Sequence, residues 1–161
     1  MQHLKPGHGM ETVAQMDELC LNLLTRVRVS AGLDPLERIW SLEHWLASLD
    51  RVKAVTCHAD LPDYQSFCLV FDAGRSTPDR VEVERFRRDK EIEVVHRVPP
   101  PGIQALSALW WTEEDQGNVL FAKRKILLDE KAYSPAVACK MFGMLRENLE
   151  KLLGKDVCVL S

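Results

Sequence analysis

The rest of the chain is predicted to pack around WWTEEDQGNVLFAKRKILLDEKAYSPAVACKMFGMLRENLEKLL, residues 110–153. This stretch begins with an aromatic strand start at residues 110–111, passes through an acidic turn at 113–118 and continues as a β-rich run over 119–128. A helix is expected to open at Ser134 and Pro135, because apolar residues then recur with the spacing of one buried helical face. These residues are Ala138, Met141, Phe142, Leu145, Leu149 and Leu152. The stretch therefore predicts a strand, a turn, a second strand and a helix. This pattern indicates a structural scaffold and contains no catalytic or ligand-binding motif.

Length and composition indicate one folded domain. The chain has 161 residues, of which 46% are hydrophobic and 28% are charged, and such a composition is typical of ordinary globular domains. No apolar run approaches the roughly 20 residues needed to cross a bilayer, and residues 1–9 lack the hydrophobic core of a signal peptide. We therefore expect a flexible tail over residues 1–9, a single α+β domain over residues 10–161, and a cytoplasmic location without membrane contact.

Net charge and cysteine content argue against two classes of protein, nucleic-acid binders and disulfide-stabilised domains. The net charge of −3 argues against broad nucleic-acid binding, which normally needs a basic excess. The five cysteines are an odd number without close pairs, so a disulfide framework is not expected. They are Cys20, Cys57, Cys68, Cys139 and Cys158. Free thiols among aliphatic residues behave as small hydrophobes, which agrees with a reducing compartment.

Two helices are predicted before the first strand. Over residues 10–28 apolar side chains recur at helical spacing, at Val13, Met16, Cys20, Leu23, Leu24 and Val27. The second helix is expected to begin near Asp34, which suits the N-cap position, with Pro35 in the first turn and Glu37 completing a capping box. Trp40 and Trp45 widen the apolar face of this helix, so it is expected to contact either two neighbours in the core or another protein chain.

After residue 51 the hydrophobic period changes to two, which predicts an antiparallel sheet of about five to six strands. Residues 67–71 are apolar on both faces, so this strand is expected either to be covered on both sides or to lie in a contact with a partner. Residues 81–84 and 92–98 predict a charged hairpin in which glutamates face arginines. Phe86 falls out of phase with Val81 and Val83, which indicates a bulge or the end of that strand. With a long C-terminal helix packed on the sheet, the predicted fold class is α+β.

The search for catalytic and metal-binding motifs is mostly negative. The sequence has no phosphate-binding glycine loop, no dinucleotide fingerprint, no HExxH and no paired CxxC. Cys57 and His58 are neighbours on a predicted strand, so their side chains point to opposite faces and should not form a catalytic pair. His3 and His8 are flanked by glycines that leave them unorganised as metal ligands. No catalytic residue, no cofactor and no metal site is therefore predicted.

A set of cations is a second candidate for a site. If the middle hairpin and residues 123–125 meet in the sheet, these cations could bind an acidic peptide or phosphates. The interleaved glutamates largely cancel the charge of the hairpin, which favours a solvated, salt-bridged face. The cations of the hairpin are Arg85, Arg87, Arg88, Lys90 and Arg97, and its glutamates are Glu82, Glu84, Glu91 and Glu93.

The order of elements around residues 110–153 resembles that of class I type III secretion chaperones and of the small sensory-transduction-regulator-like proteins. The resemblance rests on the strand at 110–111, the turn at 115–118, the strand 119–128 and the helix that opens at Ser134 and Pro135. The sequence departs from those families in its two helices before the first strand and in a more basic middle hairpin. The resemblance implies a homodimer that binds another polypeptide along its sheet and helix surface, without catalytic residues.

The predicted function is therefore a non-enzymatic protein- or peptide-binding module, chaperone-like or regulatory, that acts as a homodimer. The residues expected to bind the partner come from the wide helix, the two-sided strand and the cationic hairpin: Trp40, Trp45, Phe67, Leu69, Phe71, Arg85, Arg87 and Arg97. One alternative is a small-ligand-binding protein or enzyme with a pocket near Trp110, Trp111 and His96. Another is an immunity or antitoxin-type inhibitor, which the sequence does not separate from the first hypothesis because its partner defines it.

Overall fold

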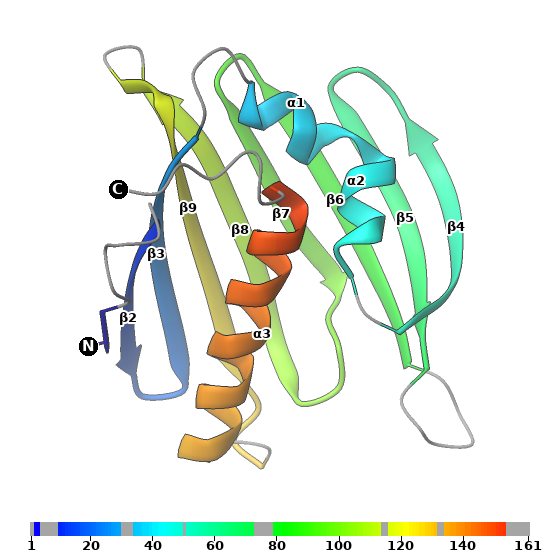
Figure 1. Cartoon of the computed structure of the whole chain (residues 1–161). Helices are drawn as coiled ribbons and strands as arrows, with labels where there is room; N and C mark the ends of the chain where they lie inside the picture. The colour runs from blue at the N-terminus through cyan, green and yellow to red at the C-terminus, as the bar shows by residue number, and fades with distance from the viewer. Residues whose placement is uncertain are drawn as a thin grey trace.

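One antiparallel sheet of nine strands, in the order β1-β2-β3-β9-β8-β7-β6-β5-β4, dominates the computed structural model. The structure describes residues 2–3, 10–29, 34–49, 51–72, 79–113, 116–131 and 134–153. All three helices lie on one face of the sheet (Figure 1), which we call the helix-covered face; the opposite face is the outer face. The strands are β1 (Gln2–His3), β2 (Met10–Asp17), β3 (Cys20–Arg28), β4 (Val52–Asp60), β5 (Tyr64–Phe71), β6 (Asp79–Arg88), β7 (Glu91–Val98), β8 (Ile103–Glu113) and β9 (Gln116–Leu128). The helices are α1 (Pro35–Trp40), α2 (Leu42–Ala47) and α3 (Pro135–Leu153).

Residues 10–28 form the β2–β3 hairpin, so the predicted first helix is wrong. The apolar residues there fit a period of two as well as a helical period, and the alternation prevails: Leu21, Leu23 and Val27 are buried, whereas Leu24 is 47% exposed. β3 also pairs with β9, whose backbone forms hydrogen bonds with the N–H and C=O groups of β3. In a helix these groups would bond within the segment itself. The turn between β2 and β3 has no glycine or asparagine that would have predicted a hairpin. Glu18 adopts the left-handed conformation there, with φ 53°.

The second predicted helix is present as two short helices, α1 and α2. Oδ1 of Asp34 accepts hydrogen bonds from the backbone N–H groups of Leu36 at 3.0 Å and Glu37 at 3.4 Å, so the predicted N-cap is confirmed. The helix is interrupted at Ser41, whose hydroxyl accepts from the backbone N–H of His44 and caps α2. The predicted fold class, a sheet of about five to six strands preceded by two helices, is therefore wrong.

Two apolar clusters fill the helix-covered face, and α3 contacts both. The large cluster brings α1 and α2 onto the sheet, and its buried members are Val27, Val29, Leu36, Ile39, Trp40, Trp45, Phe67, Leu69, Val81, Val83, Ile92, Val94, Trp110, Leu120, Ala122 and Leu152. The small cluster consists of Leu21, Leu23, Ile103, Ile126 and Leu128, with Met16, Leu106 and Met141 packed against it. α3 thus contributes Met141 near its start to the small cluster and Leu152 at its end to the large one.

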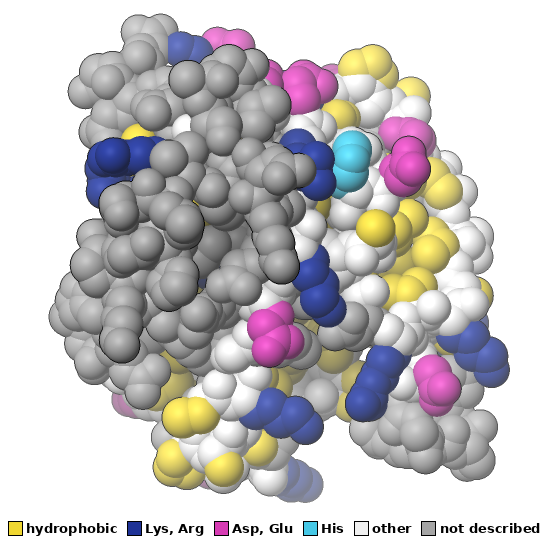
Figure 2. Space-filling view, in the orientation of Figure 1, with side chains coloured by type: hydrophobic (Ala, Val, Ile, Leu, Met, Phe, Trp, Pro, Cys, Tyr) yellow, Lys and Arg dark blue, Asp and Glu magenta, His cyan; other side chains and the backbone are white. Residues whose placement is uncertain are grey.

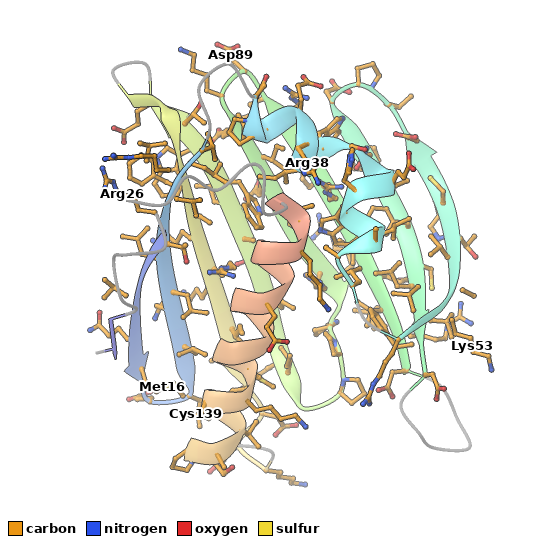
Figure 3. All side chains as sticks on the ribbon, in the orientation of Figure 1. Met16, Arg26, Arg38, Lys53, Asp89 and Cys139 are labelled. Atoms are coloured by element: carbon orange, nitrogen blue, oxygen red, sulfur yellow. The ribbon has the colours of Figure 1, made fainter. Side chains whose placement is uncertain are left out.

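The end of α3 is fastened to α1. Nε of Arg38 donates a hydrogen bond to the backbone carbonyl of Leu152 at 2.8 Å, and Figure 3 labels Arg38 on α1 beside that end of the helix. Around α2, partly buried residues of the large cluster such as Leu46 and Val52 reach the surface, and Figure 2 shows hydrophobic side chains gathered on the side of this face where α2 and β4 lie. No described helix is both long enough and apolar enough to cross a membrane.

Candidate functional site

Arg85 lies in the middle of the large cluster, where it is fully buried. It points to the helix-covered face because it follows Val81 and Val83 at a spacing of two on β6. Its guanidinium carbon lies 5.1 Å from the centroid of the Trp40 ring and 5.0 Å from that of Trp45, which are cation–π distances. Two aromatic rings of α1 and α2 therefore enclose this charge.

Hydrogen bonds hold both terminal nitrogens of Arg85, whereas its buried Nε has no partner among the described residues. Nη1 donates to Oε1 of Gln65 at 3.0 Å, and Nη2 donates to the backbone carbonyl of Ile39. Gln65 in turn donates to the carbonyl of Trp40 and to the carboxylate of Asp60, each at 3.2 Å. Burial lowers the pKa of Arg85 to about 9, and the attraction of Asp60 opposes that shift. Arg85 thus joins α1 and α2 to the sheet through groups of the chain itself.

The residues predicted to bind a partner fall into separate places. Within or beside the large cluster the structure brings together the buried Trp40, Trp45, Phe67, Leu69 and Arg85 and the partly buried Phe71. Arg87 forms an ion pair with Glu37 of α1 at 2.6 Å. Arg97 lies apart from this group, where it pairs with Glu84, and its side chain is 60% exposed. A role of these side chains in binding a partner stays a prediction.

Among the described side chains, a polar seam lies between the two apolar clusters on the strands under α3. On β9, Ala122 belongs to the large cluster and Ile126 to the small one, and Arg124 lies between them. On β3, Thr25 has the same position between Leu23 and Val27. We define the polar seam as Thr25 and Arg124 together with two further side chains of the helix-covered face, His96 of β7 and Trp110 of β8, whose ring belongs to the large cluster.

Arg124 is a buried cation in this seam. The residue is 4% exposed, and its Nη2 donates a hydrogen bond to the hydroxyl of Thr25 at 2.5 Å. Desolvation lowers the pKa of Arg124 to about 10, so the guanidinium keeps its charge at neutral pH. The seam therefore places a positive charge between two apolar surfaces.

Trp110 adds an N–H donor to the polar seam, and His96 adds a neutral imidazole. Nε1 of Trp110 is buried and has no hydrogen-bond partner among the described residues, although buried indole N–H groups usually find one. Nδ1 of His96 lies 3.2 Å from the carbonyl oxygen of Leu106. Because a carbonyl only accepts, Nδ1 carries the proton and Nε2 keeps its lone pair. Burial lowers the pKa of His96 to about 4, so the ring is uncharged at neutral pH.

The residues of the predicted small-molecule pocket divide between the two faces of the sheet. Trp110 and His96 share the helix-covered face, whereas Trp111 lies on the outer face, where it stacks on Phe121 with a centroid distance of 5.4 Å. Cys57 is exposed on the edge strand β4, and three strands separate it from β8. Within the described ranges, no three His, Cys, Asp or Glu side chains are grouped closely enough to hold a metal ion.

The sequence analysis includes Arg124 only within the cation run 123–125, for which it favours a solvated face, and it does not identify Thr25. A signal for Arg124 is present, since it lies two residues after Ala122 and two before Ile126, which gives all three the same face of a strand. Its neighbours Lys123 and Lys125 are exposed, and they make the run look like a solvated charge cluster. The buried cation differs from the exposed ones in the face of the strand to which it points, not in residue type.

No family model and no curated protein sequence matches this chain. Solved structures do match it. The di-domain aromatase/cyclase StfQ from the steffimycin biosynthetic pathway has a TM-score of 0.67 at 15% sequence identity, over 86% of this chain and 49% of that one, so the chain spans about half of its length. The ZhuI aromatase/cyclase from Streptomyces sp. R1128 has a TM-score of 0.64 at 15% identity, over 85% and 93% of the two chains.

A STAR-related lipid transfer protein from Xanthomonas axonopodis also matches, with a TM-score of 0.59 at 14% identity, over 95% of this chain and 98% of that one. The chain has the fold of aromatase/cyclases and START-type lipid-transfer proteins. At such identities the likeness establishes the START-type fold alone.

The START-type fold corrects several predictions made from the sequence. The resemblance to type III secretion chaperones and sensory-transduction regulators is wrong, because the similar structures are aromatase/cyclases and lipid-transfer domains. The prediction of a chaperone-like, non-enzymatic module that binds polypeptides is wrong for the same reason, since proteins of this fold include enzymes and carriers of small molecules. Neither the described residues nor the similar structures support the predicted polypeptide partner or homodimer.

Proposed function

We propose that this protein binds a small, mostly apolar molecule between α3 and the strands β3, β8 and β9. The polar seam carries the proposal, because it adds to the apolar interior Arg124, Thr25 and the Nε1 of Trp110, which has no hydrogen-bond partner among the described residues. Small-molecule sites commonly combine apolar walls with a few polar groups that fix the orientation of the ligand. A lipid-transfer protein among the similar structures supports this function.

The contacts of α3 agree with a ligand lying along the helix. Its described anchors are Met141 in the small cluster and Leu152 in the large one. A rise of 1.5 Å per residue separates these anchors by roughly 16 Å, and the polar seam lies between the two clusters. A molecule of that length would contact apolar side chains at both ends and the polar seam in its middle.

Binding of the neutral fluorophore N-phenyl-1-naphthylamine tests this function. We expect saturable binding with enhanced emission, and at least a tenfold loss of affinity in Ala108→Phe, because Ala108 is the Cα partner of Arg124 on β8. Ser107→Phe is the matched control, since the neighbouring residue of the strand points to the outer face. Melting temperatures of both variants report on folding. An unsaturable signal, or equal losses in the two variants, would contradict the proposal.

Catalysis on the bound molecule is a second candidate. It is favoured by Arg124, which can polarise a carbonyl, on the same face as His96, whose uncharged Nε2 is a weak proton acceptor because burial lowers the pKa of the ring to about 4. The aromatase/cyclases among the similar structures support it. Formation of an aromatic product from a poly-carbonyl chain, followed by ultraviolet absorbance, would support this candidate. A protein that binds such a chain and leaves it unchanged would contradict it.

A further inference from the structure

We propose that the indole N–H of Trp110 donates a hydrogen bond to a carbonyl oxygen of the bound molecule, so that the site selects apolar ligands that carry a carbonyl group. This inference rests on the proposed function and adds the chemical class of the ligand and the residue that recognises it. Without this hydrogen bond, the site would distinguish ligands of one shape only by their hydrophobicity.

The N–H group of Trp110 is a buried hydrogen-bond donor. Trp110 is 7% exposed, and its Nε1 has no hydrogen-bond partner in the part of the chain that the structure describes. The Nε atoms of Arg85 and Arg124 share that property, but other nitrogens of these two guanidinium groups do form hydrogen bonds. Nε1 is the only polar atom of the Trp110 side chain, so the entire hydrogen-bonding capacity of this side chain is open to a ligand.

The side chains beside Trp110 on the helix-covered face offer no acceptor to its N–H. Its Cα partners are Ile92 on β7 and Ala122 on β9, and Ala108 precedes it by two residues on the same face of β8. These three side chains are apolar. Thr112, two residues after Trp110, carries a hydroxyl, but Nε1 does not bond to it. An acceptor for Nε1 is therefore expected from a bound molecule.

The two alanines place short, apolar side chains next to the indole. Ala122 is fully buried in the large cluster, and Ala108 packs against that cluster. In Figure 1, α3 crosses the strands β8 and β9 that carry these residues, and Leu152 near the end of α3 belongs to the same cluster as Trp110. A ligand between α3 and these strands would therefore lie beside the indole N–H.

A carbonyl oxygen matches a single N–H donor in apolar surroundings. The indole N–H only donates and a carbonyl oxygen only accepts, so one hydrogen bond pairs both groups. A hydroxyl group would bring its own proton, which would need a second acceptor in a place where the neighbouring side chains are apolar. A buried donor recovers the hydrogen bond it lost to water only when it meets an acceptor. A ketone should therefore gain more at this position than a hydrocarbon of the same shape.

Two competitors of nearly equal shape test the inference. 2-Acetylnaphthalene and 2-ethylnaphthalene differ by one oxygen atom in place of two hydrogens, and each is titrated against bound N-phenyl-1-naphthylamine. In Trp110→Phe we expect the affinity for the ketone, relative to that for the hydrocarbon, to fall at least about fivefold, because the ketone oxygen would be buried without a donor. The ratio cancels changes of packing that the smaller phenyl ring causes for both competitors. Trp111→Phe is the matched control, since it makes the same substitution on the outer face and should leave the ratio unchanged.

Nuclear magnetic resonance of the wild-type protein gives a measurement that does not depend on the folding of a variant. The chain has four tryptophans, and sequential assignment identifies the indole N–H resonance of each. The proton resonance of Trp110 should move further downfield with the ketone than with the hydrocarbon, because a hydrogen bond deshields the proton. The resonance of Trp111 should not distinguish the two competitors.

The outcomes separate the inference from the proposed function. If N-phenyl-1-naphthylamine does not bind the wild-type protein, the proposed function itself is overturned. If the probe binds but the ketone fails to displace it, or the affinity ratio is the same in Trp110→Phe, the inference is overturned and the proposed function stands. An unchanged ratio is the result expected if an ordered water satisfies Nε1. An equal change of the ratio in Trp111→Phe, or a Trp110 resonance that responds alike to both competitors, would also overturn the inference.

Discussion

Arg85 and Arg124 occupy the same face of one sheet, on β6 and β9, and both are buried. Arg85 is surrounded by two tryptophan rings, an amide and a backbone carbonyl. It lies among apolar residues of the helices and strands that belong to one cluster. Arg124 donates to Thr25 where that interior separates into two clusters. The difference teaches that a buried cation stabilises the fold where the chain encloses it. Arg124, in contrast, lies where the described apolar side chains form two clusters, and there we propose a ligand site.

The largest expected effect concerns Arg85. We expect Arg85→Met to lower the free energy of unfolding by about 3 kcal/mol, because the acceptors on Gln65 and Ile39 lose their donor inside an apolar cluster. Denaturant titration measures the change. Arg87→Met is the control, since it removes a partly exposed ion pair with Glu37 and should cost under about 1 kcal/mol. Equal costs for the two variants would break the comparison, because Arg85 would then not support the fold.

A smaller effect concerns His96, which borders the seam. Its folded-state pKa of about 4 lies below the ordinary value of 6.5, so the unfolded chain takes up the proton first as the pH falls. Stability is therefore full above pH 6.5 and is lost as the pH falls towards 4. Between pH 7 and pH 4.5 this residue should account for a loss of about 2 kcal/mol, at about 1.4 kcal/mol per pKa unit.

Denaturant titrations of His96→Gln at both pH values test this expectation. The variant should lose less stability on acidification than the wild-type protein by that amount. His58→Gln replaces an exposed histidine of β4 and should leave the acid sensitivity unchanged. Identical pH dependence in all three proteins would mean that burial near the seam does not keep the imidazole neutral.

The smallest expected effect concerns the hydrogen bond inside the seam. Thr25→Val keeps the shape of the side chain and removes the acceptor for Arg124, which should cost about 1 kcal/mol of unfolding free energy. In an Arg124→Met background the same substitution should cost much less, because the donor is already gone. Denaturant titration of the four proteins closes this double-mutant cycle. Equal costs in both backgrounds would show that the two seam residues are not coupled.

Local patterns predicted several elements correctly. The alternation of Val81 and Val83 and the turn after Arg88 agree with the β6–β7 hairpin, and the side chain of Asp34 caps α1. At Phe86 the same pattern predicts a bulge or the end of the strand, and this prediction is wrong. The strand continues there, with Arg85 on the helix-covered face and Phe86 against Tyr64 on the other. Arg85 follows Val81 and Val83 at a spacing of two, and this spacing indicates a buried arginine even though charged residues are usually expected at the surface.

The sequence by itself determined which residues alternate along a strand and where capping and turn residues interrupt the pattern, because these depend on neighbours within a few positions. It also pointed to Trp110 and His96 as one alternative site. Only the tertiary structure decided that residues 10–28 are strands, because β3, on which β2 pairs, takes its other backbone partners from β9, about 100 positions away. For the same reason only the fold revealed the seam: burial of Arg124 and Thr25 depends on strands and a helix that are distant in sequence.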